Sequence, residues 1–179
     1  MSDPATGAGL EGTSWRNANI VLVLVAIALI VTTVLLLTKG AAAAPGDSRA
    51  ETLSRQYDAV TKAAREETLA FLTVDYKGMD PLIAKVLAGS TGTFKEQYER
   101  AKVTLKSSAQ DSQAISSGKV IAVGISDIGD SDAVVFVAAD SQVQNKSTKG
   151  VAQPRYYRLK LTMVRKGERW LTSNLQFVG

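Results

Sequence analysis

The chain lacks cysteine and histidine, and aromatic residues make up only 6% of its 179 residues. Without cysteine, it can form no disulfide, iron–sulfur cluster, thiolate zinc site or thiol nucleophile. Without histidine, imidazole acid/base catalysis and nearly every transition-metal site are excluded as well. Carboxylate or tyrosine chemistry, or no chemistry at all, remains possible, and we expect a non-enzymatic protein that uses no cofactor and no metal. The length allows one ordinary domain and a short appendage.

One apolar run stands out near the N-terminus. Residues Ile20–Leu37 contain no charged residue, glycine or proline. At about 1.5 Å per residue, a helix of this length comes close to the ~30 Å hydrocarbon thickness of a bilayer. The sequence therefore predicts one membrane-spanning helix over residues 20–38, flanked by a disordered tail (residues 1–19) and a small-residue linker (residues 39–46).

A cleaved signal peptide is the alternative interpretation of this run, because Ala41–Ala44 supplies small residues of the kind that signal peptidase accepts. The run is longer than the usual ~7 to 15 residue signal core, which favours an uncleaved anchor. Flanking charges leave the orientation open. Arg16 lies before the run and Lys39 and Arg49 after it, and long domains translocate largely regardless of such charges.

Residues 47–179 are predicted to fold as one domain that begins with helices. Apolar residues recur with helical spacing from Ser48 to about Val74, and again from Asp80 to Gly89. A third amphipathic stretch begins at Thr93, which, like Ser48, stands three residues before a glutamate in a capping-box pattern. We therefore expect one long helix and two shorter ones.

Beyond Ser116 the period of the apolar residues changes from about 3.6 to 2, which is typical of strands. Four antiparallel strands are predicted, over Val120–Ile125, Ala133–Ala139, Tyr156–Val164 and Trp170–Val178. Helices followed by a meander of strands indicate an α+β fold, with the helices packed on one face of a curved four-stranded sheet.

Several segments carry a family resemblance. They are Val74-Asp75-Tyr76 after the long helix, AGSTGTFKEQY over Ala88–Tyr98 and GERWLTSNL over Gly167–Leu175. With the single N-terminal span, these segments resemble the actinobacterial Mce-associated membrane proteins. The resemblance implies a nuclear transport factor 2-like cone, an inner-membrane anchor with the domain outside the cytoplasm, and an accessory role beside Mce lipid-import complexes. It carries no catalytic residue over to this chain.

A cone-shaped fold can enclose a cavity between its sheet and its long helix, and aromatic residues are candidates to line it. The candidates for this lining are Tyr57, Phe71, Tyr76, Tyr157 and Trp170. A lipid or sterol would then fit, and Asp75 or Asp140 could serve as a general base, as in isomerases of the same superfamily. The alternative is that these aromatic side chains belong to the packed core.

Charge is distributed unevenly along the domain. The segment Ser141–Gly179 carries eight basic residues and one acidic residue, whereas the preceding part of the domain is net acidic. A basic patch is predicted on the third strand and the neighbouring turns, formed by Arg155, Arg158, Lys160, Lys166 and Arg169. It suits anionic lipid headgroups or an acidic partner better than nucleic acid, because no recognition helix or aromatic single-strand platform accompanies it. A solvated face that prevents strand aggregation is the alternative.

Three classes of function follow. The first is an anchored accessory or assembly protein of an Mce-type lipid-import complex, single-pass in the bacterial inner membrane, with protein partners from that complex. The second is a component of a secretion or conjugation apparatus with the same cone fold, a class in which homo-oligomers are common. The third is a lipid-binding protein or isomerase that uses the cavity.

Overall fold

The computed structural model describes residues 45–179, with side chains described from residue 48. The larger compact unit is Glu51–Gly179. The predicted tail, the membrane span and residues 39–44 of the predicted linker lie outside the described residues, whereas Pro45 and Gly46, predicted to end the linker, begin a helix. Among residues 45–179, no helix is long and apolar enough to cross a membrane. The elements follow in the order α2 (Pro45–Leu72), β1 (Val74–Asp75), α3 (Met79–Gly89), α4 (Gly92–Ser112), β2 (Ile115–Ile128), β3 (Asp132–Gln144), β4 (Gln153–Lys166) and β5 (Arg169–Phe177).

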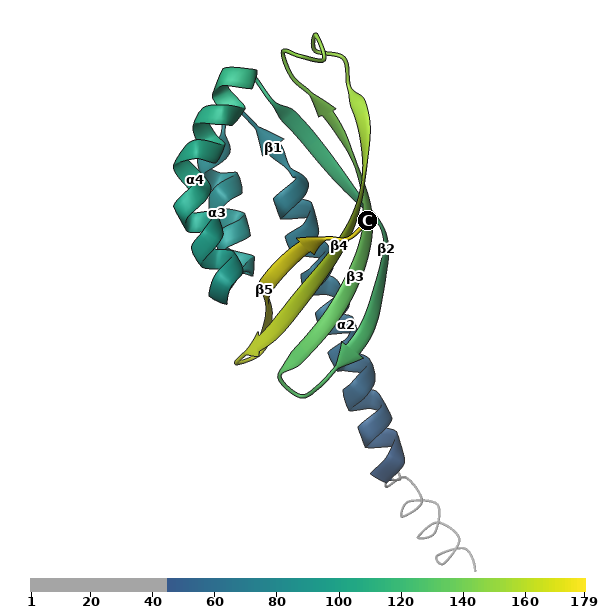
Figure 1. Ribbon diagram of the computed structural model, residues 1–179. Helices are drawn as coiled ribbons and strands as arrows, with labels where there is room; N and C mark the ends of the chain where they lie inside the picture. The colour runs from purple at the N-terminus through teal and green to yellow at the C-terminus, as the bar shows by residue number, and fades with distance from the viewer. Residues whose placement is uncertain (1–44) are drawn as a thin grey trace, which may run out of the picture. The chain divides into compact units, whose positions relative to one another are not determined.

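The strands form one antiparallel sheet in sequential order from β1 to β5, with the helices on one face (Figure 1). The predicted α+β class and the three helices are confirmed. Register shifts leave Ile121 and Ser126 of β2 and Ser173 of β5 unpaired. Such bulges bend strands and increase their twist, so the sheet curves around α2.

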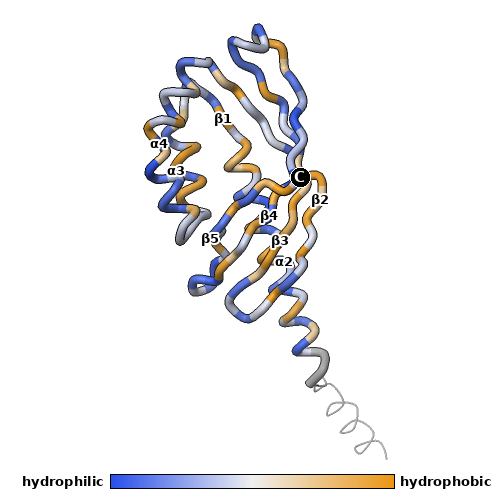
Figure 2. Tube along the Cα trace, in the orientation of Figure 1, coloured by the Kyte–Doolittle hydropathy of each residue, from blue (hydrophilic) through white to orange (hydrophobic). Residues whose placement is uncertain are grey.

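The core lies between α2 and the inner face of the sheet. Val60 and Ala64 of α2 pack against alternating residues of β3 and β4, among them Leu159, Leu161 and Met163. These three side chains are fully buried, as the two-residue period of the strand predicts. Figure 2 shows hydrophobic stretches on the central strands and a hydrophilic β4–β5 turn.

The sheet has five strands where the sequence predicts four. Val74, predicted to end the long helix, and the next residue, Asp75, form β1 and pair with Ser116 and Ile115. The helix ends at Leu72, and the Thr73 hydroxyl donates a hydrogen bond back to the Leu69 carbonyl over 2.6 Å. A two-residue strand is too short to show an alternating pattern in the sequence. These residues form a strand only because they pair with β2.

The start of α4 also differs from the prediction. The N-cap is Thr91 and not Thr93, and it makes no side-chain capping bond. Its backbone amide instead donates to the Thr172 carbonyl of β5 over 2.8 Å, next to a bridge between Ser90 and Thr172. The helix therefore begins where the chain leaves the sheet edge.

Candidate functional site

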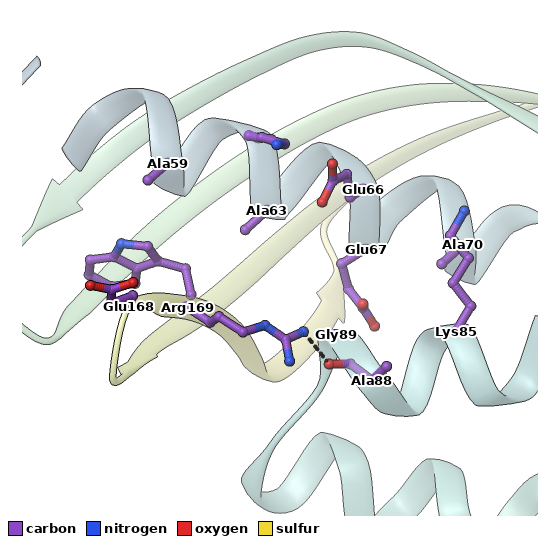
Figure 3. Close-up of a pocket in the computed structure, with 12 residues that line it drawn as sticks. Ala59, Ala63, Glu66, Glu67, Ala70, Lys85, Ala88, Gly89, Glu168 and Arg169 are labelled. Carbon is purple, nitrogen blue, oxygen red and sulfur yellow. Dashed lines mark hydrogen bonds between the residues drawn. The ribbon is translucent and has the colours of Figure 1, made fainter. Parts of the chain in front are cut away.

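A pocket of about 430 Å³ opens where α2, the end of α3 and the β4–β5 turn meet. Three short segments line it: Ala59 to Ala70 of α2, Lys85 to Gly89 of α3, and Glu168 to Trp170. Figure 3 shows these side chains converging from the three elements. The inner wall consists of small side chains and the buried Trp170, while charged side chains form the exposed rim.

Glu67 is the chemically unusual residue of this pocket. Its side chain is only 3% exposed, and its Oε1 atom has no hydrogen-bond partner among the described residues. Burial disfavours the charged carboxylate and raises the pKa of Glu67 to about 8. The carboxyl group is therefore mostly protonated at neutral pH.

Gly89 makes room for this carboxyl group. A Cβ atom at Gly89 would lie 1.8 Å from Glu67 Oε2, so any larger residue would displace the acid. Figure 3 shows Glu67 running from α2 toward Gly89. Gly89 therefore ends α3 and also lets the buried carboxyl group of Glu67 pack against the backbone.

Arg169 reaches the same place from the β4–β5 turn. Its guanidinium donates a hydrogen bond to the Ala88 carbonyl over 2.9 Å, at the C-terminal end of α3 (Figure 3). Lys62 and Lys85 also lie on the rim, and none of these three cations forms an ion pair within the described part of the chain.

The structure distributes the five candidate cavity aromatics over several places. Trp170 lines the pocket and is buried. Phe71 packs against the rings of Phe94 and Tyr98, with centroids 6.1 and 6.4 Å away, and Tyr157 contacts Phe177 at 5.9 Å.

The two remaining aromatics, Tyr76 and Tyr57, lie outside this pocket lining as well. Tyr76 packs beside the cluster of Met79 and Ile83 near α3. Tyr57 is 45% exposed on α2.

Neither aspartate considered as a general base lines this pocket. Asp75 belongs to β1 and accepts a hydrogen bond from the Lys77 amide. Asp140 lies on β3, where it pairs with Tyr156 and Lys119. Among the described residues, the buried carboxyl group is that of Glu67, for which the sequence predicted no role.

The spacing of apolar residues in the long helix indicates that Glu67 faces the core. Val60, Ala64, Glu67 and Phe71 follow one another at steps of four, three and four on the apolar stripe of the long helix. An acid within such a stripe is placed toward the core, where burial disfavours its charged form.

The candidate basic residues separate into two groups. Arg158 and Lys160 lie on the face of β4 opposite the buried Leu159 and Leu161. Arg169 lies on the helix side of the sheet, in the pocket. Arg155 and Lys166 are exposed near the two ends of β4.

The face that carries Arg158 and Lys160 is called the outer sheet face here. Its residues form two cross-strand rows, Ala122–Ala138–Arg158 and Gly124–Phe136–Lys160. Phe136 is 42% exposed, and the neighbouring Ile121 is 52% exposed. No described helix covers this face (Figure 1).

A metal site is not evident in the described part of the chain, where no group of three or more acidic side chains is placed to hold an ion. A single buried carboxyl group can hold a proton and donate one hydrogen bond. The pocket therefore has the features of a binding site.

Solved structures share this fold at low sequence identity. The periplasmic domain of DotI matches with a TM-score of 0.57 and 12% identity, covering 68% of this chain and 94% of that one. CagV, a VirB8 homologue of the type IV secretion system of Helicobacter pylori, matches at 0.54 and 6% identity, covering 68% and 97%. An IcmL-like type IV secretion system protein from Legionella pneumophila matches at 0.54 and 12%, covering 66% and 88%. These likenesses show a common fold.

One relative is similar in sequence. The uncharacterized protein Rv1363c of Mycobacterium tuberculosis (strain ATCC 25618 / H37Rv) is 28% identical over 130 residues, which are 72% of this chain and 49% of that protein. The chain thus spans about half the length of this relative. The family model described as "Uncharacterized protein Rv1363c/MT1408-like" matches residues 18–179. Because this match covers nearly the whole sequence, the chain belongs to the Rv1363c/MT1408-like family.

Proposed function

We propose that this chain is a non-enzymatic, membrane-anchored accessory or assembly protein, whose domain binds partner subunits outside the cytoplasm. The observation that carries the proposal is the outer sheet face, where exposed apolar side chains lie beside Arg158 and Lys160, two cations that form no ion pair with any residue that the structure describes. Apolar surface next to unpaired charge is a combination suited to a protein partner.

The arrangement of this face favours an acidic subunit as the partner. Phe136 lies directly across from Lys160, and the small residues Gly124 and Ala138 leave the apolar surface accessible. A partner would bury the aromatic ring and place carboxylates against Lys160 and Arg158. Because side chains alternate between the two faces along β4, Arg158 and Lys160 both project from the outer sheet face.

Two kinds of envelope machinery fit such a subunit. The sequence resemblance to Mce-associated membrane proteins supports a lipid-import complex. The fold shared with DotI, CagV and the IcmL-like protein supports a secretion-type apparatus, in which the chain would act as an oligomer. Purifying the full chain from solubilised membranes and identifying its partners by mass spectrometry separates the two, because permease and substrate-binding subunits would accompany it only in the first case.

The proposed topology predicts that alkaline phosphatase fused after Gly179 is active, because this enzyme folds only outside the cytoplasm. A fusion to β-galactosidase at the same position should be inactive. The two activities are measured in cells that express equal amounts of fusion protein. A well-expressed but inactive phosphatase fusion would contradict a domain outside the cytoplasm.

Reversing the two outer-face cations should abolish partner binding. In the double variant Arg158→Glu, Lys160→Glu, we expect loss of co-purification with little change in folding. Arg158 is exposed and Lys160 half-buried at the surface, and surface charge changes usually alter stability by less than about 0.5 kcal/mol. Parent binding should also weaken with added salt, since exposed charges are screened over about 8 Å at physiological ionic strength.

The matched control is Lys146→Glu, Lys149→Glu, which makes the same charge change at two exposed residues of the β3–β4 loop. This control should keep all partners. If the double variant on β4 keeps them too, with unchanged salt sensitivity, the outer sheet face is only solvated surface.

A further inference from the structure

We propose that the pocket between α2, α3 and the β4–β5 turn binds a small organic anion, a carboxylate on a short apolar chain, which forms a hydrogen bond with the buried Glu67 carboxyl group and is held by the cations of the rim. This binding site is separate from the outer sheet face and does not depend on the proposed assembly function.

The unpartnered acid is the first argument for a ligand. Buried polar atoms are nearly always hydrogen-bonded, and each exception calls for an explanation. Glu67 Oε1 is such an exception, and Gly89 keeps the space that the carboxyl group occupies free of any side chain. A ligand oxygen that accepts a hydrogen bond from the Glu67 carboxyl group would satisfy the acid while it keeps its proton.

The charges around the pocket indicate the sign of the ligand. Lys62, Lys85 and Arg169 contribute three positive charges, while Glu66 and Glu168 contribute two negative ones. With Glu67 protonated, the balance is one excess positive charge. An anion is therefore favoured over a cation, which the three basic side chains would repel.

Arg169 is the best placed of these cations. One of its amino groups already bonds the Ala88 carbonyl, which fixes the guanidinium beside Gly89. Its remaining donors are free to bind a carboxylate in the bidentate manner typical of arginine.

The inner wall suits a short hydrocarbon chain. Ala59, Ala63 and Ala70 of α2 present methyl groups to the pocket, and Trp170 contributes an indole ring. The volume of about 430 Å³ is within the usual range for small-molecule sites.

Protonation of Glu67 couples this binding to pH. The titratable and charged groups that face it are Lys62 and Glu66 on its own helix, Lys85 on α3, Tyr98 on α4, and Glu168 and Arg169 on the β4–β5 turn. Burial and the charge of Glu67 raise the pKa of Tyr98, so this tyrosine stays neutral throughout the neutral range. Above the pKa of Glu67, the Glu67 carboxylate must take up one proton when the anion binds. The affinity for the anion therefore falls about tenfold for each further pH unit.

The test uses the purified full chain with Trp15→Phe, so that Trp170 is the only tryptophan left to report binding by fluorescence. Hexanoate should bind saturably at pH 6.5 and about thirtyfold more weakly at pH 9.5, from the pKa of about 8. Hexylammonium, which has the same chain and the opposite charge, should not compete.

Two variants connect the effect to named residues. Glu67→Gln keeps a neutral hydrogen-bond donor, so it should bind hexanoate with nearly the same affinity at both pH values. Arg169→Gln should weaken binding at pH 6.5 at least tenfold, while Lys95→Gln, a change at an exposed α4 residue that does not line the pocket, should not.

The proposal is overturned if the parent shows no saturable binding of hexanoate, if hexylammonium binds instead, or if Glu67→Gln retains the pH dependence. All measurements use the isolated protein without partners. A failure here is therefore distinguishable from a failure of the assembly proposal, which co-purification tests.

Discussion

Replacing Glu67 with glutamine should remove a pH-dependent loss of stability that the parent domain shows between about pH 4.5 and 8. The unfolded chain releases the Glu67 proton near the ordinary value of 4.5, whereas the folded domain keeps it until about pH 8. Between these values the native state binds more protons than the unfolded state, so stability falls as pH rises. Below pH 4.5 both states are protonated and the contribution is fully present.

The expected size of this effect is large. A pKa raised from 4.5 to about 8 corresponds to a loss of about 5 kcal/mol, complete above pH 8. This is comparable to the entire stability of many domains, about 5 to 15 kcal/mol. Glutamine cannot ionise, so we expect the variant to be the more stable protein at pH 9.

The measurement is urea unfolding of a fragment comprising residues 45–179, from pH 4 to pH 9, for the parent and Glu67→Gln. Subtracting the free energy of unfolding of Glu67→Gln from that of the parent at each pH cancels the contributions of the other titrating groups. The matched control is Glu66→Gln, the adjacent exposed acid on the same helix, which should change stability by less than about 0.5 kcal/mol at every pH. Parallel curves for parent and Glu67→Gln would show that Glu67 is ionised in the folded domain.

Trp170→Ala should destabilise the same fragment by about 3 to 5 kcal/mol, because truncating a buried aromatic residue removes its apolar contacts and leaves a cavity. Trp170 is 6% exposed and belongs to the core cluster that joins α2 to the sheet, with Val60 and Ala64. Thermal and urea unfolding measure the loss, and the melting temperature should fall by many degrees.

Trp170→Phe is the matched control for this variant, since it keeps an aromatic ring and should retain much of the stability. The two roles of Trp170, in the core and in the pocket, are separable by experiment. If Trp170→Ala unfolds like the parent but no longer binds hexanoate by isothermal titration calorimetry, which needs no tryptophan, the residue serves the pocket and not the core.

The sequence correctly predicts those helices and strands in which the order of apolar and polar residues shows which face is buried. The apolar stripe of α2 and the alternation of Leu159, Leu161 and Met163 in β4 predict a long helix and a two-faced strand, and the structure has both. These patterns can be recognised in the sequence because residues one period apart lie on the same face of a helix or strand and so share the same environment. The extra length of β2 and β3 could not be predicted, since polar residues such as Ser116 and Ser141 join the sheet only through their partners.

What the sequence alone determined is the α+β class, the three helices, the direction shared by Arg158 and Lys160, and the exclusion of cysteine and histidine chemistry. Only the tertiary structure decided the site. It brings Glu67, Gly89 and Arg169 together from positions far apart in the chain, and it separates Arg169 from Arg158 and Lys160. The physical reason is that a pKa depends on what surrounds a group in space, and a carboxyl group becomes a neutral acid only where a helix end and a turn exclude water from it.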